Sequence, residues 1–261
     1  MLFINCGGIF IYKLNGNVAL ITGVSHENGI GAAICKKLAS EGADIFFTHY
    51  GSNADWVKTF EDNTREYGVR CGNLEVDLAD PGAPFNVLEA VTAEMGLPAI
   101  LVNNAAHSTR DGYMNLDAQT LDDHYAVNMR ATFLLSVEFA RRFRKSPMPV
   151  GRIINLTSGQ ALGPMPGELA YAATKGAISA FTLSLSAELA PLGITVNAVN
   201  PGPTDTGWMN EEIKREILPK FPLARVGIPE DAARLVAFLA SEEAEWITGQ
   251  VLNSEGGFLR G

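Results

Sequence analysis

The sequence predicts a single-domain α/β fold in which helices cover both faces of a doubly wound sheet of about seven parallel strands. Two observations carry this prediction. Short apolar runs alternate with longer helical patterns along the chain, and the first apolar run leads directly into a glycine-rich turn. Strands that alternate with helices form right-handed βαβ units, and such units build a parallel sheet.

The predicted strands are apolar along their whole length rather than at every second position. Burial on both faces of a sheet explains such continuous runs. In chain order they are residues 17–22 (NVALIT), 43–48 (ADIFFT), 71–77, 99–103 (AILVN), 152–157 (RIINLT), 194–199 (ITVNAV) and 250–253.

The predicted helices fill the intervals between these strands. They are residues 31–40, 55–67, 85–95, 119–144, 169–189 and 229–240. No linker composition, low-complexity tract or internal repeat divides the chain, so we expect residues 14–261 to form one domain after an N-terminal arm of residues 1–13. That arm is apolar, but it lacks the features of a signal peptide and is too short to span a bilayer.

Composition excludes several classes of function. A net charge of −9 and a pI near 5.0 argue against non-specific binding to nucleic acid. The three cysteines are far apart and no Cys/His cluster has ligand spacing, so we expect neither a disulfide framework nor a metal site. These features, and the lack of a membrane span after the arm, favour a cytoplasmic protein.

The glycine-rich turn predicts a nucleotide site. Gly23, Gly29 and Gly31 lie between the first strand and the first helix. Glycine lets a pyrophosphate approach the backbone, and the helix N-terminus offers free N–H groups and the positive end of its dipole. At this place in a βα unit the pattern indicates a Rossmann-type dinucleotide site, with Ser25 and Ile30 among the contacts. An ordinary turn is the alternative.

The ends of the next two strands bear on which dinucleotide is bound. A site for NAD usually has an acid after the second strand, and this chain has Thr48, His49 and Tyr50 there. The missing acid favours NADP, although no arginine is present to hold the extra phosphate, so NAD stays open. His49 is either a cofactor contact or a polar strand-end residue. Asp77 and Leu78 are expected at the adenine, with a helix cap as the alternative for Asp77.

A tyrosine and a lysine on one helix form the predicted catalytic pair. Tyr171 and Lys175 are four residues apart and share a helix face, in a stretch that is otherwise uncharged. A nearby ammonium favours the phenolate, so we expect it to lower the pKa of the tyrosine and to suit it for proton transfer. The alternative is a lysine that extends to solvent beside a core tyrosine.

Together these features resemble the classical short-chain dehydrogenase/reductase family over about residues 14–261. The run 103–106 (NNAA) resembles the family's NNAG, with alanine in place of the final glycine. Asn128 lies in the long helix where the family carries its catalytic asparagine. Ser158 ends the fifth strand, thirteen residues before Tyr171, as the family's serine does.

The resemblance also assigns cofactor contacts. Asn104 and Ala105 of the NNAA run are expected at the cofactor. Pro201 and Gly202 follow the sixth strand, and Thr204 and Thr206 are placed like the residues that hold the nicotinamide in the family.

One departure from the family pattern is clear. The family's glycine loop is usually TGxxxGxG, and here two extra residues separate Gly23 from Gly29. Enoyl reductases of the superfamily also have lengthened loops, but they usually place six residues between the catalytic tyrosine and lysine. This chain has three between Tyr171 and Lys175, which favours carbonyl or alcohol chemistry over reduction of a carbon–carbon double bond.

The resemblance implies a role for each catalytic residue in hydride transfer between a nicotinamide and a carbonyl carbon. Tyr171 protonates the developing alkoxide, and Ser158 holds the carbonyl oxygen. Lys175 lowers the pKa of the tyrosine and binds the nicotinamide ribose, and Asn128 holds a water that links the lysine to solvent. A turn residue is the alternative for Ser158, and a solvent-facing helix residue for Asn128.

Substrate contacts are expected around the same site. Residues 204–221 are expected to form a lid that includes Trp208, and Gln160 and His107 are further candidates, with a structural role as the alternative for both. The segment 247–258 (ITGQVLNSEGGF) resembles the family's closing strand, which implies a homotetramer.

Several functions fit this reading. Reduction of a 3-oxoacyl thioester, on an acyl-carrier protein or coenzyme A, is favoured over a sugar, steroid or small-alcohol dehydrogenase. A dinucleotide-sensing protein without turnover is the alternative from another class, and it would not need the Ser158, Tyr171 and Lys175 set.

Overall fold

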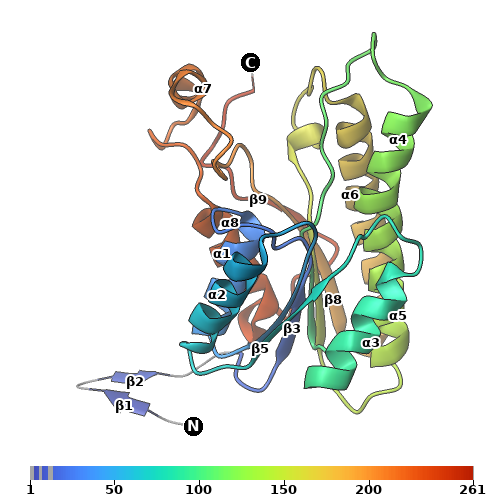
Figure 1. The fold of residues 1–261 in the computed structure, drawn as a ribbon, viewed down its shortest axis with the longest axis vertical. Coiled ribbons are helices and arrows are strands. Elements are labelled where there is room, and N and C mark those ends of the chain that lie inside the picture. Colours follow the sequence, from blue (N-terminus) through green and yellow to red (C-terminus); the bar gives the residue numbers. More distant parts are fainter. Residues whose placement is uncertain (1–2, 6–7, 11–13, 261) are drawn as a thin grey trace.

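The chain is described from a computed structural model, which describes residues 3–5, 8–10 and 14–260. Seven strands form one parallel sheet in the order β5-β4-β3-β6-β7-β8-β9, so the predicted sheet is confirmed (Figure 1). The strands are β3 (Val18–Ile21), β4 (Asp44–His49), β5 (Cys71–Glu75), β6 (Ile100–Asn103), β7 (Gly151–Leu156), β8 (Ile194–Asn200) and β9 (Val251–Asn253).

Helices cover both faces of this sheet. In Figure 1, α1, α2 and α8 lie on one side, and α3, α5 and α6 lie on the other. The α-helices are α1 (Ile30–Ser40), α2 (Ala54–Arg65), α3 (Ala83–Met95), α4 (Ala118–His124), α5 (Thr132–Phe143), α6 (Leu169–Leu189), α7 (Glu211–Ile217) and α8 (Pro229–Ala240). None of the helices in the described part of the chain is long and apolar enough to cross a bilayer.

The core explains why the strands are apolar throughout. Ile45 and Phe47 of β4 pack with α1 and α8, whereas Phe46 between them packs with α3 and α5 on the opposite face. Successive side chains of a strand point to opposite faces, so a sheet covered on both sides buries every position.

One predicted helix is divided in the structure. The region predicted as a helix over 119–144 is α4, then a π-helical segment, η1 (Tyr125–Ala131), and then α5. Segments of π-helix are rare and often occur at functional sites. Asn128 lies inside this one.

The N-terminal arm forms an antiparallel strand pair, β1 (Phe3–Asn5) with β2 (Gly8–Phe10). The rest of the predicted arm, residues 1–2, 6–7 and 11–13, lies outside the described residues.

The order of the strands also places the crevice. Strand β3 pairs with β4 on one side and with β6 on the other. Strands β4 and β5 are therefore added on one side of β3, and the later strands are added on the other side. In open α/β sheets ligands bind at the carboxyl ends of the strands, at such a switch point.

Candidate functional site

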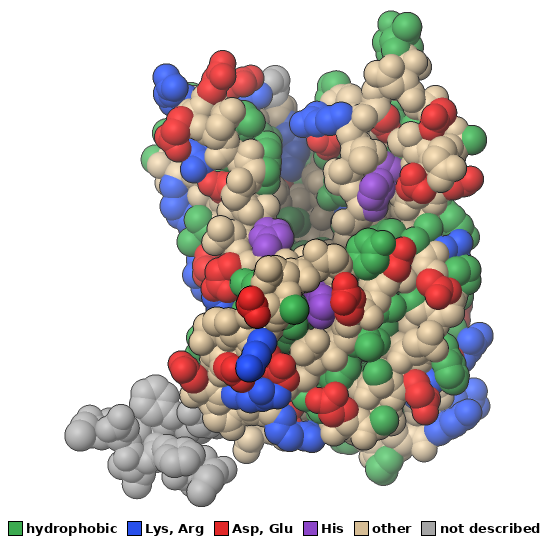
Figure 2. All heavy atoms as spheres, in the orientation of Figure 1, with side chains coloured by type: hydrophobic (Ala, Val, Ile, Leu, Met, Phe, Trp, Pro, Cys, Tyr) green, Lys and Arg blue, Asp and Glu red, His purple; other side chains and the backbone are tan. Residues whose placement is uncertain are grey.

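Two cavities open at the carboxyl edge of the sheet. One of about 470 Å³ lies over the ends of β3, β4, β5 and β6, and we call it the loop cavity. The other, of about 620 Å³, lies between the ends of β7 and β8, the start of α6 and the 204–208 loop, and we call it the serine cavity. Figure 2 shows the molecular surface hollowed between these parts of the chain.

The glycine loop is shaped by close packing against the NNAA run. Gly23 has φ +72°, and a Cβ there would lie 2.5 Å from the Cα of Ala105. A Cβ on Gly31 would lie 2.7 Å from Nδ2 of Asn104. The same Nδ2 donates to the carbonyls of Thr22 (2.9 Å) and Gly23 (3.0 Å). These two bonds hold the start of the glycine loop against the NNAA run.

The predicted cofactor contacts divide between the two cavities and the packing beneath them. The loop cavity is lined by Gly23, Ser25, His49, Asp77, Leu78 and Ala105. The serine cavity is lined by Ile30, Tyr171, Pro201, Gly202, Thr204 and Thr206. Gly29 is the N-cap residue of α1, and Gly31 and Asn104 support the loop from the inside.

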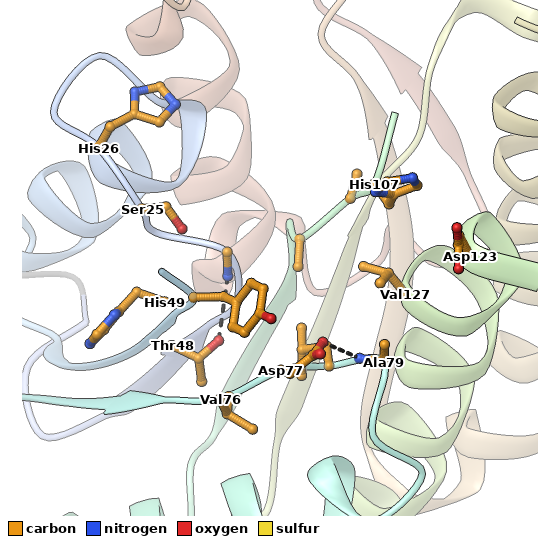
Figure 3. Close-up of a pocket in the computed structure, with 15 residues that line it drawn as sticks. Ser25, His26, Thr48, His49, Val76, Asp77, Ala79, His107, Asp123 and Val127 are labelled. Carbon is orange, nitrogen blue, oxygen red and sulfur yellow. Dashed lines mark hydrogen bonds between the residues drawn. The ribbon is translucent and has the colours of Figure 1, made fainter. Parts of the chain in front are cut away.

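The loop cavity carries acids and histidines but no lysine or arginine among its described lining residues. In Figure 3, Thr48 and Asp77 lie on one side, and His107, Asp123 and Val127 lie on the other.

His49 and Asp77 each have a partner in the protein. The ring of His49 is buried, points away from Asp77 in Figure 3, and places its Nε2 3.2 Å from Oδ1 of Asn73. Asp77 accepts a hydrogen bond from the backbone N–H of Ala79 at 2.8 Å. This bond closes a local turn and is not a helix cap, because α3 begins at Ala83 with Gly82 as its N-cap residue, and the carboxylate lines the cavity.

Lys175 is buried beneath the serine cavity. Its side chain is 2 % exposed, its Nζ donates to the carbonyl of Leu156 at 2.8 Å, and Nζ lies 5.5 Å from the centroid of the Tyr171 ring. Burial lowers the pKa of this lysine to about 8, because a charged ammonium is poorly solvated there. The predicted pair is therefore brought together on α6, and solvent does not reach its cation.

Tyr171 lines the serine cavity, and its pKa differs from the prediction. Burial, the larger cause, and the charge of Glu168 together raise the pKa of the phenol to about 12, and a hydrogen bond with Ser158 partly opposes them. We expected Lys175 to lower the pKa of Tyr171, but in the protein without a bound cofactor this pKa is raised. The physical reason is that desolvation penalises the phenolate more than the neighbouring groups stabilise it.

Ser158 lies at the cavity end of β7. Its Oγ is 3.9 Å from Sδ of Met165, and both residues line the serine cavity beside Tyr171. A hydroxyl and a phenol that face one cavity can both donate to a single substrate oxygen.

The side chain of Asn128 is fully buried, and both polar atoms of its amide are bonded. Its Oδ1 accepts from the backbone N–H of His107 (2.7 Å), and its Nδ2 donates to the carbonyl of His107 (2.9 Å) and to Oγ1 of Thr174 (3.0 Å). Both N–H groups of the amide are used and Oδ1 accepts one bond, so the side chain can bond a water only through Oδ1. The water-holding role stays a prediction, and the bonds observed fix the chain after β6 against α6.

Three predicted substrate residues have different surroundings. Trp208 lines the serine cavity, and its Nε1 donates to the carbonyl of Thr204 at 3.0 Å. The Gln160 amide turns towards α6, where it donates to Oγ of Ser179 at 3.1 Å, and Gln160 does not line the cavity. His107 lines the loop cavity instead of the serine cavity.

Asp111 is a residue that sequence reasoning missed. It is buried, and its two carboxylate oxygens accept the backbone N–H groups of Leu169 and Ala170, each at 2.8 Å. Desolvation opposes its ionisation, but the bonds from Ala170, Gly112 and Leu169 prevail and lower its pKa. Asp111 therefore holds the first turn of α6. Asp111 and Leu169 are 58 positions apart in the sequence, so no local pattern predicts their contact.

The described residues hold no group of three or more His, Cys, Asp or Glu side chains that could bind a metal ion.

The chain is similar to known oxidoreductases. A family model described as "Enoyl-(Acyl carrier protein) reductase" matches residues 23–259. An "Uncharacterized oxidoreductase YjdA" of Bacillus subtilis is 64 % identical over 94 % of this chain and 97 % of its own length. A "3-oxoacyl-[acyl-carrier-protein] reductase FabG" of Aquifex aeolicus is 36 % identical over 95 % of this chain and 99 % of its own.

Among solved structures, a blue fluorescent protein from a metagenomic library, in complex with NADPH, has a TM-score of 0.86. It is 34 % identical, over 95 % of this chain and all of the other.

Proposed function

Because the chain belongs to the short-chain dehydrogenase/reductase family of oxidoreductases, we propose that it transfers a hydride between NADP and a carbonyl or alcohol carbon. The observation that carries this proposal is the convergence of Tyr171, Ser158 and buried Lys175 at one wall of the serine cavity. A sensing protein without turnover would have no need to bury a lysine under a tyrosine, because an unused buried ammonium is costly.

The two cavities fit a dinucleotide. The loop cavity suits the adenosine half, and the serine cavity suits the nicotinamide together with the substrate, since Tyr171 and Thr206 line it. The cofactor supplies the hydride when it is bound. NADP is favoured over NAD because no acid follows β4 at His49 and because the similar structure is a complex with NADPH.

Proton delivery is the protein's part of the chemistry. Tyr171 donates its phenolic proton to the carbonyl oxygen as that oxygen gains charge, and Ser158 holds the same oxygen with its hydroxyl. Lys175 uses one N–H on Leu156, so its other donors are free to bind ribose hydroxyls and to stabilise the phenolate that remains. A water that links this lysine to solvent would receive no hydrogen bond from the Asn128 amide, because both of its N–H groups are already donated.

Carbonyl reduction is favoured over enoyl reduction despite the description of the family model. Tyr171 and Lys175 lie on successive turns of α6, with three residues between them rather than six. Within carbonyl chemistry, the relative named as a 3-oxoacyl-carrier-protein reductase favours a 3-oxoacyl thioester on acyl-carrier protein or coenzyme A. A sugar, steroid or small-alcohol substrate is the second candidate, because the cavity also has a polar lining.

A panel of carbonyl compounds, assayed with NADPH and with NADH in parallel, tests this function. We expect oxidation of NADPH with at least one 3-oxo ester or thioester, and loss of that activity in Tyr171→Phe. Turnover that is equal in the wild type and in the variant would overturn the proposal.

The assembly is expected to be a homotetramer in a reducing, cytoplasmic setting. The edge strand β9 leaves Val251 40 % exposed, and Cys35 and Cys71 are both free thiols. An open edge strand is a ready surface for a second copy. Light scattering after gel filtration measures the mass, and a monomer would contradict the expectation.

A further inference from the structure

The segment 255–260 closes one side of the serine cavity. Phe258 and Arg260 line that cavity together with Ser158 and Gly159. The guanidinium carbon of Arg260 lies 5.3 Å from the centroid of the Phe258 ring. A cation thus borders the place where the reacting carbonyl is expected to bind.

Arg260 is fixed from behind by a carboxylate. Its Nη1 and Nη2 donate to Oε1 and Oε2 of Glu255 at 2.9 and 2.5 Å, in a two-pronged ion pair. Oε2 also accepts from Nδ2 of Asn200, the last residue of β8, at 2.9 Å. The pairing with Arg260 lowers the pKa of Glu255. The carboxylate does not line the serine cavity, so the cavity faces the cation and not the anion.

The loop after Ser158 is shaped to receive this arginine. A Cβ on Gly159 would lie 2.1 Å from Nη2 of Arg260, and a Cβ on Gly163 would lie 2.8 Å from its Cδ. Side chains at either position would collide with Arg260, so both glycines let it lie against the loop. The guanidinium is therefore held beside Gly159, the residue that follows Ser158 in the chain.

Most of the hydrogen-bonding capacity of Arg260 remains free. A guanidinium has five N–H donors, and Glu255 accepts two of them. Within the described ranges of the chain, no other acceptor bonds the remaining three. The neighbouring wall is formed by Pro164, Met165 and Trp208. A polar substrate oxygen would be the natural partner for these donors.

The other cation of the cavity is placed differently. The side chain of Arg110 is 73 % exposed and pairs with Glu168, which itself lines the cavity, at 3.2 Å. Its charge is therefore screened by solvent and neutralised within the cavity. The side chain of Arg260 is only 17 % exposed, so its charge is screened less by solvent.

We propose that Arg260 is a specificity-determining residue that donates hydrogen bonds to a second carbonyl oxygen of the substrate, and so selects 1,3-dicarbonyl compounds over simple ketones. The inference rests on the proposed function, since Ser158 and Tyr171 must hold the first oxygen. One carbon separates the two carbonyl carbons of a 3-oxo ester. The guanidinium lies against Gly159, which follows Ser158 in the chain, so its free donors lie on the same side of the cavity as the hydroxyl that holds the first oxygen.

Binding of two ligands in the presence of NADP⁺, which cannot reduce them, tests the proposal. The ligands are ethyl 3-oxobutanoate and 2-octanone, which have equal numbers of non-hydrogen atoms, and quenching of Trp208 fluorescence reports their affinity. We expect Arg260→Met to weaken binding of the 3-oxo ester about tenfold or more and of 2-octanone less than about threefold. Arg260→Lys, which keeps the charge but loses the fork, should be intermediate.

Arg225→Met, which removes a two-pronged ion pair with Asp231 outside the serine cavity, should leave both affinities within about threefold of the wild type. If Arg260→Met fails to fold, Glu255→Gln, which keeps the guanidinium and weakens its anchor, should reduce the same selectivity. Equal weakening for both ligands, or a wild type that does not discriminate between them, would overturn the inference. A wild type that discriminates but reduces no carbonyl with NADPH would refute the proposed function and leave the role of Arg260 standing.

Discussion

The ammonium Nζ of Lys175 lies 5.5 Å from the centroid of the Tyr171 ring and donates to the carbonyl of Leu156 at 2.8 Å. Leu156 is the last residue of β7, and Ser158 follows it two positions later. The bond to Leu156 therefore fixes Lys175 of α6 relative to Ser158. This arrangement has consequences that can be measured.

Tyr171→Phe should remove the proton donor and leave the cavity shape unchanged. We expect turnover to fall by about a thousandfold or more, with cofactor affinity within about threefold of the wild type. Steady-state kinetics and NADPH fluorescence titration measure the two effects. Tyr113→Phe is the control, because Tyr113 is 86 % exposed and does not line either cavity. A Tyr171→Phe enzyme with more than a tenth of wild-type turnover would rule out the role given to the phenol.

Lys175→Met should inactivate the enzyme and yet stabilise the cofactor-free protein near pH 7. Burial lowers the pKa of Lys175 to about 8, so below that pH the fold carries the cost of a desolvated charge. The variant removes this desolvation cost, which is larger than the free energy contributed by the bond to Leu156. We therefore expect the free energy of unfolding to increase by about 1–2 kcal/mol. Urea denaturation of both proteins measures it.

The same variant should show a defined dependence on pH. Between about pH 8 and pH 10.5 the unfolded chain binds more protons at Lys175 than the folded chain, so wild-type stability rises with pH in this window. The advantage of Lys175→Met should therefore shrink between pH 7 and pH 10. An advantage that stays constant would mean that the lysine is not desolvated as the structure shows.

Asp111→Ala should slow catalysis through the position of α6. Loss of the bonds to Leu169 and Ala170 frees the turn that precedes Tyr171, so we expect kcat to fall about tenfold while cofactor affinity stays within about twofold. Asp111→Asn, which keeps one acceptor oxygen, should recover part of this loss.

Asp117→Ala is the matched control for Asp111, because Asp117 caps α4 through the N–H of Thr120 at 2.8 Å. Both alanine variants should lose about 1 kcal/mol or more of stability, and only the one at Asp111 should lose kcat. If the two variants lose kcat equally, Asp111 has no special role in placing Tyr171.

Gly23→Ala should damage the cofactor site more than an equivalent change elsewhere. Gly23 and Gly16 both have positive φ, +72° and +83°, but a Cβ collides with Ala105 only at Gly23, and nothing lies within 4 Å of one at Gly16. We expect Gly16→Ala to cost about 1 kcal/mol and Gly23→Ala clearly more, with loss of NADPH binding. Thermal unfolding and cofactor titration check this, and equal losses in both variants would contradict it.

The sequence alone predicted the sheet and the shared helix face of Tyr171 and Lys175. Continuous apolar runs such as NVALIT can only belong to strands covered on both faces, so the seven strands of the sheet were predictable from local pattern. The spacing of Tyr171 and Lys175 fixed their shared helix face, because it follows from the geometry of one helix.

Only the tertiary structure decided how these residues are partnered. The amide of Asn128 donates to His107 and Thr174. Asp111 accepts hydrogen bonds from the start of α6, far along the chain, and Arg260 lies against Gly159. The pKa of Tyr171 is raised rather than lowered because its surroundings come from several elements. Contacts between distant segments depend on how helices pack on the sheet, and the pKa values depend on how deeply this packing buries each group. Local sequence patterns predict neither of them.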